Sequence, residues 1–185
     1  MRVLITGGAG FVGSRLARAL LAAGTLAGRR IERIVLADQA GAPAWLLADR
    51  RVEGRVGTLL ALADALRDEP FDAVFHLASA VSGECETDFE LGMRSNLDST
   101  RALLDALRQR VQQRGAAPTR LVFSSSIAVF GPDPAHPFPA QVGDDTLPTP
   151  QTSYGTQKLV CEQLIADYTR KGFVDGRAAR LMTVT

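Results

Sequence analysis

The chain alternates between short apolar runs and longer segments in which apolar residues recur at helical spacing. The apolar runs have the length of strands, and we expect strands at residues 2–6, 31–37, 51–56, 71–77, 119–125 and 178–184. Helices are expected between them, at residues 11–23, 58–68, 87–113 and 152–171. Such alternation is typical of a parallel sheet with helices on both faces. The pattern therefore predicts an α/β fold with a doubly wound parallel sheet, formed as one domain by residues 1–185.

One long segment shows neither the apolar run of a strand nor the spacing of a helix. Residues 131–150 contain six prolines, which exclude a helix or a central strand. We expect a long loop over a ligand site at this position. The alternative is a solvated surface connection, and composition alone does not separate the two.

The first expected strand leads directly into a glycine-rich turn and then into a helix, within residues 3–13. Gly8, Gly10 and Gly13 fit the pattern GxGxxG, and Gly7, Gly10 and Gly13 fit the alternative pattern GxxGxxG. Glycines make such a turn tight and let the backbone approach a diphosphate closely. The phosphates then sit on unpaired N–H groups at the positive end of the helix dipole. This context favours a Rossmann-type dinucleotide-binding domain over a purely structural turn.

An acidic residue ends the second expected strand. Asp38 lies 25 positions beyond Gly13, where a carboxylate accepts hydrogen bonds from the adenosine ribose hydroxyls of a bound dinucleotide. The same carboxylate would repel a 2′-phosphate, and no arginine immediately follows it. The predicted cofactor is therefore NAD rather than NADP.

A second group of polar residues has the spacing of a proton-transfer site. Ser126 follows the apolar run 121–123 at the expected carboxyl end of a strand, and Tyr154 and Lys158 lie at i and i+4 on one expected helix face. A nearby ammonium and a positively charged nicotinamide favour the phenolate form of a tyrosine, which then acts as a base. Ser126 can hold a substrate hydroxyl or a developing oxyanion. The alternative is an amphipathic stripe packed on a neighbouring element, but the glycine turn favours catalysis.

Composition narrows the class of partner and the compartment. The net charge is +1 and no long basic run occurs, so neither nucleic acid nor an anionic membrane surface is an expected partner. No signal peptide or membrane span can be placed, and the expected location is the cytoplasm. Cys85 and Cys161 lack the spacing of a disulfide framework or a zinc site. His76 is expected to be packed and His136 exposed, and no metal site is predicted because neither has a ligand partner at useful spacing.

The last expected strand ends the chain without a following element. Ligands of parallel α/β sheets bind outside the carboxyl ends of the strands, and the part of the site beyond the last strand needs more chain. We therefore expect a truncated domain that lacks most of a C-terminal substrate lobe. Such a form would keep its cofactor affinity and show little turnover.

Taken together, these motifs resemble those of the extended short-chain dehydrogenases/reductases of the NAD-dependent epimerase/dehydratase superfamily. The resemblance covers the whole chain and rests on TGGAGFVG at 6–13, Asp38, HLAS at 76–79, Asn96, the serines at 124–126, YGTQK at 154–158 and Arg180-Leu181. It implies a catalytic group of Ser126, Tyr154 and Lys158. The cofactor residues that it implies are Gly7, Gly10, Phe11, Val12, Gly13, Asp38, Leu77, Ala78, Ser79, Asn96, Tyr154 and Lys158. One departure is visible, because Gly57 is followed by Thr58 where the family often has an aspartate that reaches the adenine amine.

Further stretches narrow the resemblance to the D-erythronate dehydrogenase subfamily. They lie at residues 81–84, 88–94, 150–153 and 172–177. The resemblance implies oxidation of the C2 hydroxyl of a four-carbon sugar acid with NAD, and it places Ser82 near the substrate together with Ser126 and Tyr154. A surface loop is the alternative for Ser82. Arg94 is a candidate anchor for the substrate carboxylate if its helix turns it inward, and otherwise an exposed arginine.

Two other functions stay open on sequence grounds. A nucleotide-sugar 4-epimerase would share the cofactor site and the Ser/Tyr/Lys group, whereas a dehydratase is disfavoured because residues 127–130 after Ser126 contain no acid. A non-catalytic NAD-binding module is the other alternative. The superfamily resemblance also implies a homodimer that pairs through the helices at 87–113 and 152–171.

Overall fold

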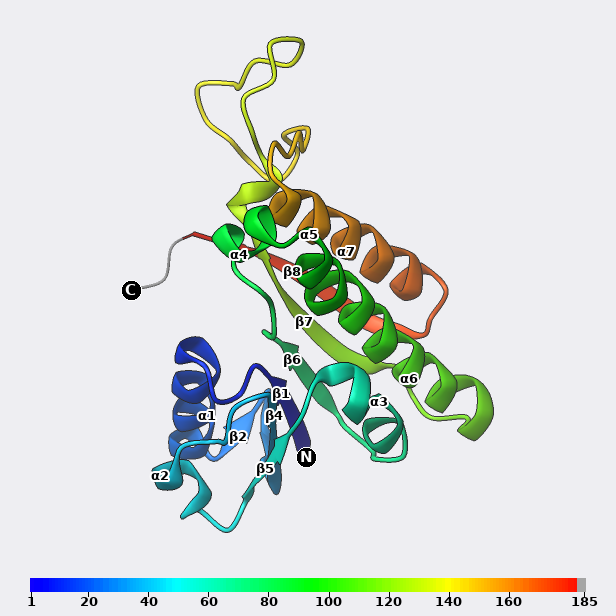
Figure 1. Ribbon diagram of the computed structural model, residues 1–185. Coiled ribbons are helices and arrows are strands. Elements are labelled where there is room, and N and C mark those ends of the chain that lie inside the picture. Colours follow the sequence, from blue (N-terminus) through cyan, green and yellow to red (C-terminus); the bar gives the residue numbers. More distant parts are fainter. Residues whose placement is uncertain (183–185) are drawn as a thin grey trace.

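Six parallel strands form the central sheet of the computed structural model, which describes residues 1–182 (Figure 1). They are β1 (Arg2–Thr6), β4 (Arg33–Asp38), β5 (Val52–Val56), β6 (Ala73–His76), β7 (Thr119–Ser126) and β8 (Val174–Leu181). Their order in the sheet is β5-β4-β1-β6-β7-β8. The strand order therefore reverses between β1 and β6, as in a doubly wound dinucleotide-binding sheet. This confirms the predicted Rossmann-type fold class.

Helices cover both faces of this sheet, because side chains of successive strand residues point to opposite sides. On one face, Val3 and Ile5 of β1 pack in a cluster with Ala17 and Leu20 of α1 (Phe11–Ala23), and α2 (Ala44–Leu47) joins it. On the other face, Leu4 packs in a cluster with residues of α3 (Leu59–Arg67), α6 (Ser99–Arg114) and α7 (Ser153–Arg170). Within residues 1–182, no helix combines the length and the apolar character needed to cross a membrane.

The last strand differs from its predicted position. β8 begins at Val174 rather than at 178, and it pairs with β7 from Thr119↔Val174 to Ser126↔Leu181. Its early part contains Gly176, against which Ile165 of α7 packs closely. A glycine there leaves room for the helix, although it weakens the strand pattern in the sequence. Residues 183 and 184 of the predicted strand lie outside the described residues.

The predicted helix at 87–113 is divided into three parts. They are α5 (Phe89–Gly92), the π-helical η1 (Met93–Asp98) and α6. Five further short elements were not predicted, namely the strands β2 (Thr25–Leu26) and β3 (Arg29–Arg30), the helices α2 (Ala44–Leu47) and α4 (Ser82–Thr87) and the 3₁₀ turn η2 (Ile127–Val129). Each is too short to show a period in the sequence.

The proline-rich segment 131–150 contains neither a helix nor a strand, as predicted. The Thr149 hydroxyl donates to the Gly131 carbonyl oxygen at 2.8 Å and so closes the base of the loop. Beyond this closure the loop projects away from the body of the protein (Figure 1). Among the described residues, none of this segment lines the large cavity considered below. The loop therefore does not lie over this cavity, and it contains local turns such as those at Asp133–His136 and Gly143–Thr146.

Charged side chains mark the two edges of the described sheet. On β5, the Arg55 side chain donates to the Glu53 carboxylate at 2.9 Å. On β8, the Arg177 guanidinium lies 2.7 Å from the Asp175 carboxylate. Each of these two strands thus carries one acidic and one basic side chain two residues apart, on the same face of the strand.

Candidate functional site

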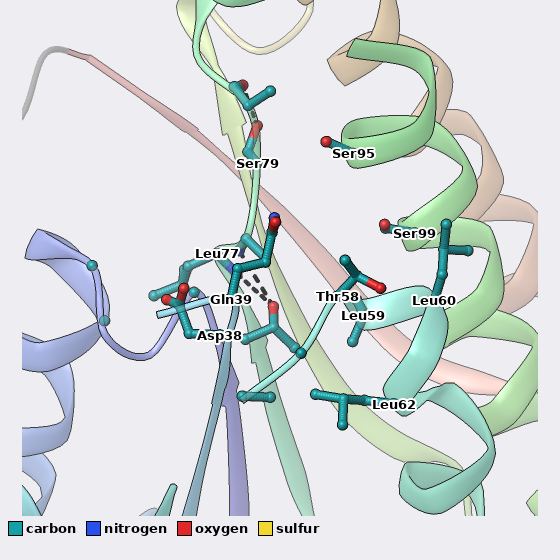
Figure 2. Close-up of a pocket in the computed structure, with 18 of the residues that line it drawn as sticks. Asp38, Gln39, Thr58, Leu59, Leu60, Leu62, Leu77, Ser79, Ser95 and Ser99 are labelled. Atoms are coloured by element: carbon teal, nitrogen blue, oxygen red, sulfur yellow. Dashed lines mark hydrogen bonds between the residues drawn. The ribbon is translucent and has the colours of Figure 1, made fainter. Parts of the chain in front are cut away.

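A cavity of about 750 Å³ opens at the carboxyl ends of β1, β4 and β6 (Figure 2). One wall is formed by the glycine turn, the end of β4 and the segment after β6. Ser95 and Ser99 lie on the opposite helical wall, across from Asp38 and Leu77. The predicted cofactor residues that line the cavity are Gly7, Gly10, Phe11, Val12, Gly13, Asp38, Leu77, Ala78 and Ser79.

The glycine turn has no room for side chains at three positions, Gly7, Gly8 and Gly13. Gly7 has φ +70°, and a Cβ on it would lie 2.8 Å from the Ala78 backbone nitrogen. A Cβ on Gly13 would collide with the Gly7 carbonyl oxygen. Gly8 instead allows the turn to pack on Leu36 of β4. The GxxGxxG glycines therefore shape the turn itself, while Gly8 of the other register serves its packing.

The amino end of α1 is prepared for an anion. Gly10 is the N-cap residue, and it has no side chain to bond the first free amides of the helix. The first turn contains no acidic residue. The positive end of the helix dipole and its N–H groups are therefore left for a ligand, and Phe11 and Val12 line the cavity there. This arrangement fits the diphosphate of a dinucleotide.

Asp38 ties the end of β4 to the glycine turn. One carboxylate oxygen accepts from the Ala9 amide at 3.0 Å, and the other accepts from the Ala40 amide at 3.1 Å. A carboxylate can accept further hydrogen bonds, so the half-buried group keeps capacity for ribose hydroxyls. Thr58, which stands at the departure from the family pattern, accepts from the Ala61 amide at 3.2 Å and caps α3.

A buried hydrogen-bond chain holds the segment after β6 in place. The Thr6 hydroxyl accepts from the amides of Leu77 and Ala78, so its proton is directed to His76 Nδ1 at 2.7 Å. The Thr100 hydroxyl donates to a carbonyl oxygen and thus accepts from His76 Nε2 at 2.8 Å. His76 is fully buried, and burial lowers its pKa to about 3. The imidazole therefore stays neutral and acts as a packed bridge, as the sequence predicts.

Asn96 braces the cavity wall from behind. Its Oδ1 accepts from the Ser79 hydroxyl at 2.9 Å and from the Ala80 amide at 2.8 Å, and its Nδ2 donates to Gln157 Oε1 at 2.8 Å. The side chain is buried and is not among the cavity-lining residues within 1–182. In this structure Asn96 thus positions Ser79, and its predicted direct contact with a cofactor stays a prediction.

Ser126, Tyr154 and Lys158 come together at the carboxyl end of β7 and the start of α7. Ser126 is the last residue of β7, and its hydroxyl accepts from the Ala128 amide at 3.1 Å. Tyr154 lies in the first turn of α7, where Gly155 permits close packing on the Ala128 carbonyl. Lys158 follows one turn later, and its ammonium donates to the Ser124 carbonyl oxygen at 2.8 Å.

Burial perturbs both titratable members of this group. Burial raises the pKa of Tyr154, while hydrogen bonding with the hydroxyls of Ser126 and Ser79 opposes that rise. Burial lowers the pKa of Lys158 to about 8. A phenol with two hydroxyl neighbours and a nearby ammonium can release and take up a proton at one position.

Ser79 connects the group of Ser126, Tyr154 and Lys158 with the cavity. It lines the cavity and its hydroxyl neighbours the Tyr154 phenol. Within the described chain, Ser126, Tyr154 and Lys158 do not themselves line the cavity. The predicted substrate residue Ser82 is exposed at the start of α4, whereas its neighbours Val81 and Glu84 line the cavity.

Several site residues were missed by sequence reasoning. Ser95 and Ser99 line the cavity and Gln157 bonds to Asn96. Ser95 and Ser99 stand at i and i+4, but the residues around them are also mostly polar, so this spacing gave no distinct signal. Gln157 gave no signal either, because its partner lies 61 positions away.

The chain is similar to a protein family, to curated relatives and to solved structures. The model of the "NAD dependent epimerase/dehydratase family" matches residues 3–185. The D-erythronate dehydrogenase of Cupriavidus necator is 48% identical over 100% of this chain and 56% of its own length. The solved nucleoside-diphosphate-sugar epimerase of Agrobacterium tumefaciens is 43% identical with a TM-score of 0.89, over 100% of this chain and 53% of that one.

A third comparison concerns a protein solved with its cofactor. UDP-glucose 4-epimerase from Brucella ovis in complex with NAD is 29% identical, with a TM-score of 0.76 over 97% of this chain and 51% of that one. The chain thus spans about half the length of the relatives that it matches.

Proposed function

The chain belongs to the NAD dependent epimerase/dehydratase family, and from this membership we propose that it forms the NAD-binding part of a dehydrogenase acting on a short sugar acid. The observation that carries the proposal is the Ser126, Tyr154 and Lys158 group beside a cavity of dinucleotide size. The 48% identity with a D-erythronate dehydrogenase along the whole chain supports the substrate class.

The glycine turn and the amino end of α1 would hold the diphosphate of NAD. Gly7 and Gly13 leave the space that a Cβ would fill, and Gly10 leaves the first amides of α1 free of a side-chain cap. Asp38 would accept the adenosine ribose hydroxyls, while Leu77, Ala78 and Ser79 would line the nicotinamide side. Bound NAD supplies an acceptor for a hydride from the substrate carbon.

The chain's own residues would then move the proton. The Tyr154 phenolate takes the proton of the substrate hydroxyl, and the C–H bond at the same carbon breaks as its hydride leaves, so a carbonyl forms. Ser126 donates a hydrogen bond to the oxygen that becomes this carbonyl. The Lys158 ammonium favours the phenolate electrostatically.

In the finer form of the proposal, the hydroxyl is that at C2 of D-erythronate and the product is the 2-keto acid. Ser126 and Tyr154 would contact this hydroxyl, and Ser82 would contact the substrate from α4. The test is NADH formation by the full-length protein with a panel of sugar acids and nucleotide sugars. We expect NADH with D-erythronate and no conversion of UDP-sugars. Activity confined to UDP-sugars would overturn the substrate assignment.

A nucleotide-sugar 4-epimerase is the second candidate, because a 43% identical solved structure carries an epimerase title. An epimerase returns the hydride to its substrate and so leaves no net NADH, which the same panel detects by product analysis. Bound NAD without any turnover would instead identify a non-catalytic module. Tyr154→Phe would abolish either reaction, so it tests whether the observed turnover depends on this group, while the product panel decides between the two reactions.

A further inference from the structure

Arg94 brings a positive charge to a cavity that is otherwise acidic. Among the described residues that line it, the charged side chains are Asp38, Glu84 and Arg94. Both carboxylates already bond to backbone amides: Asp38 to Ala9 and Ala40, and Glu84 to Val81 at 3.0 Å. An anionic ligand in this cavity therefore has one cationic side chain available to it.

The Arg94 guanidinium is not engaged elsewhere. Its side chain is exposed, and within residues 1–182 it forms no ion pair and no hydrogen bond. Other arginines of the chain do have such partners, as Arg180 has in Glu162 at 2.8 Å. A cationic side chain at a cavity, free of partners in the folded chain, is suited to meeting a charged ligand.

Arg94 belongs to the π-helical segment η1, which forms part of the helical wall of the cavity. In η1 the Ser99 amide bonds to the Arg94 carbonyl oxygen, five residues back, and the Ser99 hydroxyl donates to the same oxygen at 3.0 Å. Arg94, Ser95 and Ser99 all line the cavity, and Figure 2 shows Ser95 and Ser99 on this wall, across from Asp38 and Leu77. Arg94 thus borders the cavity from the helical wall, which lies opposite the end of β4.

We propose that Arg94 binds the diphosphate of the cofactor, across the cavity from the amino end of α1. A diphosphate carries two negative charges, whereas the amino end of one helix contributes about half a positive charge, so a guanidinium beside it adds charge compensation. The substrate carboxylate is the other anion to consider, but Ser126 and Tyr154 are absent from the lining that Arg94 shares with the glycine turn in the described chain. The inference rests on the proposed NAD site and is independent of which substrate is used.

The experiment is calorimetric titration of the chain with NAD and, separately, with adenosine, which lacks the diphosphate. Arg94→Gln should weaken NAD binding about tenfold, the low end for losing a charge-assisted hydrogen bond. Adenosine binding should stay unchanged. Arg94→Lys should recover part of the loss, and added salt should reduce the difference between wild type and Arg94→Gln. The matched control is Arg101→Gln on α6, an exposed arginine that does not line the cavity.

Four results would overturn the proposal. NAD binding by Arg94→Gln equal to that of Arg101→Gln would remove Arg94 from the cofactor site. An equal loss for adenosine and NAD would show a disturbed wall rather than a lost phosphate contact. An unchanged NAD affinity with a raised KM for the acid in the full-length enzyme would assign Arg94 to the substrate. The calorimetric comparison measures binding and not turnover, so it remains valid if the sugar-acid substrate is wrong. Wild-type protein that binds no NAD would instead refute both the cofactor site and the role of Arg94.

Discussion

The ammonium of Lys158 lies 5.4 Å from the centroid of the Tyr154 ring, one helical turn away on α7. It also lies 4.8 Å from the Phe123 ring, and within residues 1–182 it forms no ion pair with a carboxylate. The buried ammonium thus contacts one carbonyl oxygen and two aromatic rings. These groups compensate its charge only weakly, and a phenolate at Tyr154 would stabilise it further.

The buried ammonium should destabilise the folded chain below pH 8. Burial lowers the pKa of Lys158 to about 8 in the folded state, below the ordinary 10.5 of a lysine, so between these values the unfolded chain binds more protons and stability rises with pH. Lys158→Met should therefore be more stable than wild type at pH 7, by up to about 3 kcal/mol. Urea unfolding of both proteins at pH 7 and pH 10 measures this. An advantage of Lys158→Met that does not shrink at the higher pH would contradict the pKa of Lys158.

Loss of the Tyr154 hydroxyl should abolish most turnover. In the full-length enzyme, Tyr154→Phe should lower kcat by at least about 100-fold, because the ring remains but cannot take the proton. Tyr168→Phe is the matched control, since that hydroxyl donates to Asp105 at 2.8 Å, outside the catalytic group. In wild type, kcat/KM should rise with pH as the phenolate forms, because burial raises the pKa of Tyr154. Turnover of Tyr154→Phe at the wild-type rate would end the assignment.

Asp38 should determine the choice between NAD and NADP. Its carboxylate faces the cavity and would repel a 2′-phosphate, so NAD should bind at least about tenfold more tightly than NADP. Asp38→Ala should weaken NAD binding and reduce the preference for NAD over NADP. Asp38→Asn is a useful companion, because its carbonyl oxygen can still accept from the Ala9 amide that Asp38 now holds. Calorimetry with both cofactors tests the role, and tighter binding of NADP by wild type would refute it.

Two exposed apolar residues fit the expected homodimer. Phe89 of α5 and Val160 of α7 are 57% and 39% exposed, and both lie in the segments expected to pair across a two-fold axis. Val160→Glu should convert a dimer into a monomer at micromolar concentration. Val142→Glu, in the projecting loop, places the same charge at a similarly exposed valine and should have no effect. Light scattering that finds wild type monomeric would count against the pairing.

Much of the fold follows from local patterns in the sequence. The strand of residues 2–6 and the helix of 11–23 were predicted with the bounds that β1 and α1 have, since strong apolar runs and the glycine turn mark them. The start of β8 could not be predicted in this way. Its residues Asp175, Gly176 and Arg177 look like a turn, and only pairing with β7 and packing under Ile165 make them a strand.

The site was predictable where a residue's role depends on its neighbours in sequence, and less so where it depends on distant ones. The glycine turn and the spacing of Tyr154 and Lys158 are local, and the structure places them as expected. The π-helical bond between the Ser99 amide and the Arg94 carbonyl oxygen leaves no pattern in the sequence, because a π-turn is built from the same residue types as the helix around it. Nor does the sequence show that Asn96 turns inward to Ser79 and Gln157.

The charged edge strands bear on how the protein behaves when it is concentrated. An open sheet edge is a template for strands of other molecules, and sheet growth by this route leads to aggregates. Glu53 and Arg55 on the edge strand β5 would have to lose water if a strand of another molecule paired beside them. Polymerisation through the β5 edge is thereby opposed, and replacing these two charges with apolar residues would favour it.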